Sequence, residues 1–101
     1  MFQLVLQFAP WNDHDFDDLI RLENELESVV QAGEIDGHDS GSNEANIFIF
    51  TEDPAAVLQS CVPVIAEAGL LEKLAAGCRL VDEETYSRLW PVGESAPFSV
   101  A

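Results

Sequence analysis

The chain has 101 residues, of which 19 are acidic and four are basic, so its formal net charge is -15. Hydrophobic residues make up 48% of it, a share too high for a chain that stays unfolded, and the length suits one domain with one core. Nucleic acids and anionic membranes are bound by clustered lysine and arginine, whereas the four bases here are scattered. We therefore expect neither kind of binding, and we expect attraction to basic partners.

Neither a membrane span nor a secretory leader is expected. No apolar stretch approaches the roughly 18 residues of a spanning helix, and the first residues lack the basic segment of a signal peptide. Cys61 and Cys78 lack C-x-x-C spacing, so we expect two reduced, buried thiols. The cytoplasm is the expected location.

Two different periodicities predict the first two elements. Apolar and polar residues alternate over 2–8, which indicates a strand. Apolar residues then recur at helical spacing after a group of aspartates that suits a helix N-terminus, and Gly33 is the expected C-terminal cap. The sequence predicts a helix over 15–32.

A β-hairpin is predicted next. The segment 34–39 is extended and polar, 40–43 is rich in turn residues, and 45–51 is apolar on both faces. The apolar strand is expected inside the sheet, and the charged one at an edge, where its charges oppose unwanted pairing.

The second helix has clear signals at its start and a breaker inside it. Asp53 is the expected N-cap, and Pro54 suits the first helical position. The helix is predicted over 55–68, closed by Gly69, with a kink at Pro63 or a break before Val64.

The last third of the chain permits alternatives. The segment 70–76 could extend the second helix after a bend, and 78–81 resembles a short strand. Residues 86–90 alternate as a paired strand would, and a helix over 82–90 is the rival interpretation. We expect one domain over 1–91 and an irregular tail over 92–101, from which Phe98 could dock on the body.

This order of elements predicts an α+β fold of the ferredoxin-like, split β-α-β kind. Its antiparallel sheet would carry two helices on one face, with the first and third strands in the middle and an optional extra strand after the βαββαβ core. The polar character of 34–39 and the apolar character of 2–8 and 45–51 agree with that order.

Three segments resemble a group of small bacterial proteins of unknown function. They are GEIDGHDSGS over 33–42, NIFIFTEDP over 46–54 and LWP over 89–91. The resemblance implies a small bacterial α+β domain, and it implies no activity.

The predicted hairpin contains the strongest candidate ion site. Asp36, His38 and Asp39 combine imidazole and carboxylate groups, as divalent cations or acid–base chemistry require. Further polar residues follow, namely Ser40, Ser42, Asn43 and Glu44. The spacing is not that of an EF-hand, and on a regular strand Asp36 and His38 share one face while Asp39 points to the other. A polar edge strand, with Gly37 at a bulge, is the alternative explanation.

Other catalytic or metal-binding patterns are weaker. Asp13, His14 and Asp15 could ligate a metal, but helix capping explains the acids equally well. Cys61 falls among apolar helix positions, and no nucleophile elbow or phosphate loop is present. We expect no cofactor and no enzyme; an enzyme would use His38 with Asp36 or Asp39.

Acidic and aromatic residues favour a protein partner instead. Tryptophans beside prolines are common in interfaces, and an acidic helix face can steer a basic partner. The candidate partner-binding residues are Trp11, Asp13, Asp17, Glu23, Glu27 and Trp90. The expected function is a non-catalytic protein-binding module, such as an immunity-type inhibitor of a basic toxin.

Two other functions are compatible with the same residues. One is a small-molecule or metal-ion sensor that uses the hairpin over 36–44. The other is a homodimer joined through the open sheet face of Gln3, Val5 and Gln7 with Phe48 or Phe50.

Overall fold

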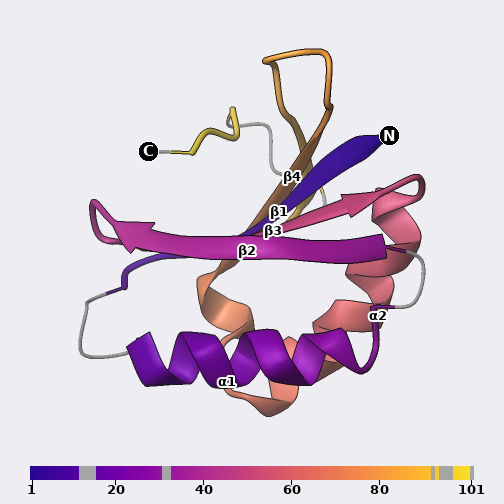
Figure 1. The fold of residues 1–101 in the computed structure, drawn as a ribbon. Coiled ribbons are helices and arrows are strands. Elements are labelled where there is room, and N and C mark those ends of the chain that lie inside the picture. Colours follow the sequence, from indigo (N-terminus) through magenta and orange to yellow (C-terminus); the bar gives the residue numbers. More distant parts are fainter. Residues whose placement is uncertain (12–15, 31–32, 92, 94–96, 101) are drawn as a thin grey trace.

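A five-stranded antiparallel sheet with two helices forms the body of the protein in the computed structural model, which describes residues 1–11, 16–30, 33–91, 93 and 97–100. The order of the strands is β2-β3-β1-β4-β5. Both helices lie below the sheet in Figure 1, and the C-terminal segment lies above it. The elements are β1 (Phe2–Phe8), α1 (Phe16–Glu27), β2 (Gly33–Gly41), β3 (Glu44–Thr51), α2 (Pro54–Glu67), the 3-10 turn η2 (Leu71–Lys73), β4 (Leu74–Leu80) and β5 (Ser87–Trp90).

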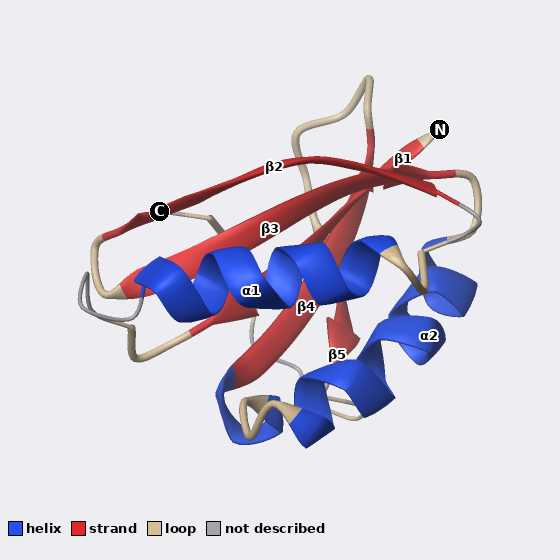
Figure 2. Ribbon diagram, turned by 60° about the horizontal axis from the view of Figure 1, so that its bottom comes forward, coloured by secondary structure: helices blue, strands red, loops and turns tan. Residues whose placement is uncertain are grey.

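The core lies between the sheet and the two helices (Figure 2). Strand β1 is interior, paired with β3 on one side and β4 on the other, and its Leu4, Leu6 and Phe8 are fully buried. The helices contribute the opposite wall, with Leu19, Leu22 and Leu26 from α1 and Val57, Cys61 and Ile65 from α2. The period-two and helical patterns of the sequence thus bury their apolar residues in one contiguous cluster.

Helix α1 is shorter than predicted. It ends at Glu27, and the amides of Val29 and Val30 both donate to the carbonyl of Leu26. Val30 is buried, so the apolar pattern continues beyond the helix although the helix does not. Gly33 is not a cap but the first residue of β2, where a Cβ would lie 2.7 Å from the carbonyl oxygen of Phe50.

Helix α2 begins as predicted and is not broken. Asp53 caps it, because its side chain accepts a 3.1 Å hydrogen bond from the amide of Ala56. The helix continues through Pro63 to Glu67, so the predicted break before Val64 is wrong. Pro63 is exposed and its ring therefore displaces no core side chain.

The predicted hairpin is confirmed. Ser42 and Asn43 both have positive φ angles, 53° and 65°, as a two-residue type I′ turn requires. The pairing of β2 with β3 shifts between Ile35 and Gly37, so Asp36 is the extra residue of a β-bulge. Strand β2 lies at one edge of the sheet.

The last third forms a strand pair rather than a helix. Strand β4 already begins at Leu74, which corrects the predicted helical extension, and β5 pairs with it antiparallel. After β5, the ring of Phe98 packs on the sheet face opposite the helices, and it is 6% exposed. A Cβ on Gly77 would lie 2.5 Å from that ring, so glycine is required there.

The contact between Gly77 and Phe98 gives a stability prediction. We expect Gly77→Ala to lower the free energy of unfolding by about 1–3 kcal/mol, because the new methyl group overlaps the ring. Urea denaturation measures this cost. In a Phe98→Ala background the same substitution should cost close to nothing, and an equal cost in both backgrounds would contradict the packing explanation.

Candidate functional site

The three predicted ion ligands of the hairpin do not converge. His38 is on the helix-facing side of β2, where its Nδ1 lies 2.5 Å from Oε2 of Glu23 on α1. Asp39 is on the opposite face and accepts a 3.0 Å hydrogen bond from the side-chain amide of Asn46. Asp36 is the exposed residue of the bulge. The prediction that His38 and Asp39 face opposite sides is confirmed, whereas the bulge removes Asp36 from the regular alternation.

The carboxylates near the hairpin turn belong to a polar network on the open sheet face. The amide nitrogen of Asn46, a residue 1% exposed, donates to Asp39 and to Glu44 at 3.0 Å each. Gln7 donates to Glu44 at 3.0 Å and to the carbonyl of Ser99 at 2.8 Å. These bonds satisfy a buried amide and attach the C-terminal segment, so the network has a structural role.

In the part of the chain that the structure describes, no three histidine, cysteine, aspartate or glutamate side chains are placed to hold a metal ion. The second predicted metal motif, Asp13, His14 and Asp15, lies outside the described residues.

The two cysteines are buried and free, as predicted. Burial raises the pKa of Cys61 to about 11, and it also raises the pKa of Cys78 above its usual value of 9.0. A nucleophilic thiol needs a lowered pKa, so both side chains are suited to packing.

All four basic side chains are engaged within the chain. Arg79 donates to the Gln3 side chain at 3.1 Å and to the carbonyl of Glu83 at 2.9 Å, which fixes the loop between β4 and β5. Arg88 donates to the carbonyl of Pro97 at 3.2 Å and lies over the Phe98 ring. The ammonium group of Lys73 lies over the ring of Trp11, and Arg21 forms an ion pair with Asp18 at 3.6 Å. Three of the bases therefore hold parts of the fold together, whereas Arg21 and Asp18 form an exposed pair that contributes little.

The candidate partner-binding residues of α1 differ in accessibility. Asp17 and Glu27 are exposed, and Glu25 and Asp18 are exposed beside them. Glu23 is only 18% exposed in its side chain and is paired with His38. Asp13 lies outside the described residues. We call the four accessible acids of α1, namely Asp17, Asp18, Glu25 and Glu27, the α1 acidic face; Asp18 among them is paired with Arg21.

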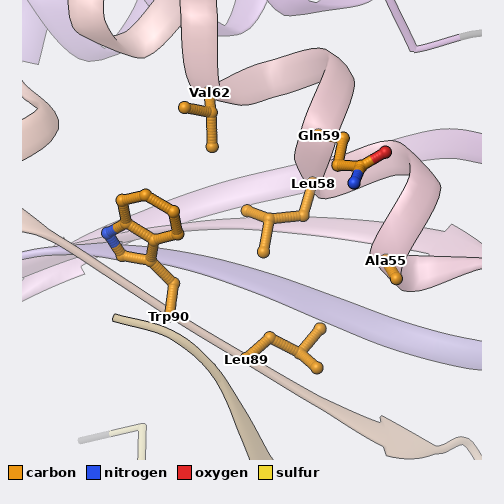
Figure 3. Close-up of a pocket in the computed structure, with 6 residues that line it drawn as sticks. All are labelled: Ala55, Leu58, Gln59, Val62, Leu89 and Trp90. Carbon is orange, nitrogen blue, oxygen red and sulfur yellow. The ribbon is translucent and has the colours of Figure 1, made fainter. Parts of the chain in front are cut away.

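The two tryptophans also separate into a core residue and a surface residue. Trp11 is 4% exposed and packs on Phe8 with 5.9 Å between ring centres, so it is not part of the surface. Trp90 is half-buried and lines a groove of about 270 Å³ between β5 and α2 (Figure 3).

Sequence reasoning missed this groove and the contact of Glu23 with His38. Leu89 and Val62 have the pattern of ordinary core positions, and no local motif shows that β5 and α2 leave space between them. The contact between Glu23 and His38 joins residues of different elements, so only the register of β2 against α1 reveals it.

The pair of Glu23 and His38 should stabilise the docking of α1 on the edge strand. In a double-mutant cycle of Glu23→Ala and His38→Ala, we expect a coupling energy of about 0.5–1 kcal/mol, as for a partly buried hydrogen bond between side chains. Additive effects in urea denaturation would show that the contact contributes nothing.

The thiols should be unreactive in the folded protein. At pH 8 we expect Ellman's reagent to modify neither Cys61 nor Cys78, because both are buried and their raised pKa values keep them protonated. Both should react at once in concentrated urea. Rapid modification of either thiol without denaturant would contradict the assignment to the core.

Comparison with known proteins assigns no family to the chain. No protein-family model matches it, and neither a curated protein nor a solved structure gives a significant match. Within the described residues, no helix is long and apolar enough to cross a membrane.

Proposed function

We propose that this protein is a non-catalytic binding module that recognises a basic protein through the α1 acidic face, for example as an immunity-type inhibitor of a basic toxin. The observation that carries the proposal is the position of Glu25 and Glu27. Both are exposed in the second half of α1, and the last turn holds no basic residue. Carboxylates at a helix C-terminus oppose the helix dipole, at a cost of about 0.3–1 kcal/mol each. Helix stability does not explain them, whereas attraction to a basic partner does.

The placement of the bases supports the same function. Arg79, Arg88 and Lys73 are held by backbone carbonyls or aromatic rings of the chain itself. These contacts are with neutral groups of the chain. On α1 itself Arg21 pairs with Asp18 at 3.6 Å, whereas no basic residue stands in the last turn, near Glu25 and Glu27. A surface of one sign accelerates association with an oppositely charged protein and disfavours association with a second copy.

We further infer that the domain is ferredoxin-like, with β5 added to the sheet beside β4. The order β2-β3-β1-β4 and the placement of both helices on one face support this interpretation. A cytoplasmic location belongs to the same proposal and is supported by the two free, buried thiols.

The test compares two variants with the same loss of charge. One neutralises the α1 acidic face with Asp17→Asn, Asp18→Asn, Glu25→Gln and Glu27→Gln. The control neutralises four other exposed acids, through Glu72→Gln, Asp82→Asn, Glu83→Gln and Glu84→Gln. Each variant and the parent protein are immobilised, and bound proteins are recovered from a cell lysate at low and high salt.

We expect the parent and the control to retain a basic protein at low salt, and the α1 variant to lose at least about nine-tenths of it, because rim charges act on association. High salt should release the partner from the parent and from the control. Retention at high salt would argue against electrostatic recognition. Equal loss from both variants would show that net charge, and not α1, attracts the partner.

A further inference from the structure

The groove beside Trp90 is an open, uncharged surface between two elements. Its lining consists of Ala55, Leu58, Gln59, Val62, Leu89 and Trp90. In Figure 3, the side chains from α2 face Leu89 and the Trp90 ring across the space. Ala55 and Gln59 are exposed, and Trp90 is half-buried, so the groove is accessible from outside.

The size of the groove indicates what it can hold. Sites for small organic ligands usually enclose about 300–1,000 Å³ and have several polar groups that orient the ligand. This groove has about 270 Å³, and among the described residues that line it the polar groups are the Gln59 amide and the Trp90 indole nitrogen. One or two aliphatic side chains fit such a space. Tryptophan beside a shallow pocket is also typical of the energetically dominant residues in protein interfaces.

The charges around the groove indicate which residues should flank the bound aliphatic side chains in the partner. Helix α2, which forms one wall, contains no lysine or arginine. Exposed acids stand at its two ends, Asp53 before the first turn and Glu67 in the last. A peptide segment with an apolar centre and basic flanks is therefore complementary to this wall.

We infer that the groove between β5 and α2 is the anchoring site for an aliphatic side chain of the partner, in a segment flanked by lysine or arginine. This inference rests on the proposed function and adds to it a second contact, separate from the α1 acidic face. The acidic face attracts the partner, and the groove supplies the apolar contact that salt does not screen.

Nuclear magnetic resonance titration of the full chain with defined peptides tests the inference. The probe is acetyl-Lys-Gly-Leu-Val-Gly-Lys-amide. One control peptide replaces both lysines by glutamate, and another replaces the leucine and valine by serine. The matched protein variants are Ala55→Tyr, which fills the groove, and Ala56→Tyr, whose site is exposed one position further along α2 and outside the lining.

We expect the probe to shift the Trp90 indole and the amides around Val62 and Leu89, and the control peptides to leave these signals unchanged. Ala55→Tyr should weaken binding of the probe about tenfold or more, and Ala56→Tyr should not. Unchanged groove signals, or equal binding to both variants, would overturn the inference. The probe and the serine control peptide both contain the two lysines. If both peptides shift the signals of α1 and the groove signals do not change, the groove inference fails while the proposed function stands.

Discussion

The structure depends on the burial of strand β1 from both sides. Leu4 and Leu6 are closed off by the helices, and Val5, on the opposite face, is equally inaccessible. A strand that is covered on both faces and paired along both edges cannot shift its register without exposing apolar side chains. Strand β1 therefore fixes the positions of β3 and β4, which pair with it. These two strands in turn position the rest of the hairpin and β5. The docking of Phe98 over Gly77 covers part of the open face where a fully exposed sheet would attract other chains.

The distribution of charge follows from the same architecture. Arg79 and Arg88 lie on the open face and hold the loop after β4 and the C-terminal segment. These bases stabilise connections that carry little apolar surface of their own. Because these bases lie on the open face, the helix side of the protein is left strongly negative. Repulsion between its acids lowers the stability of the isolated protein, and the same charge attracts basic molecules.

The sequence predicts the elements better than it predicts their ends. The alternation over 2–8 and the turn at Ser42 and Asn43 act locally, so β1 and the hairpin could be recognised. The end of α1 could not, because Val30 is buried after the helix has ended. Gly33 has the sequence pattern of a helix cap. Glycine is needed there for a different reason, because a Cβ would lie too close to the carbonyl oxygen of Phe50 on the neighbouring strand. The opposite orientation of His38 and Asp39 could be predicted from the alternation of a strand, whereas the position of Asp36 could not, because it is the extra residue of a bulge. The groove depends on packing between α2 and β5, which no local pattern records.

The central position of β1 also affects how the protein is made. The ribosome releases β1 before β3 and β4, the two strands that pair with it. The second of these partners is complete only when Leu80 has been synthesised. At the usual speed of translation, several seconds pass before both neighbours exist. During that interval the apolar strand Phe2–Phe8 has no native partner and would be a target for chaperones. The high negative charge of the nascent chain opposes aggregation over the same period, so the acidity that we assign to recognition also protects synthesis.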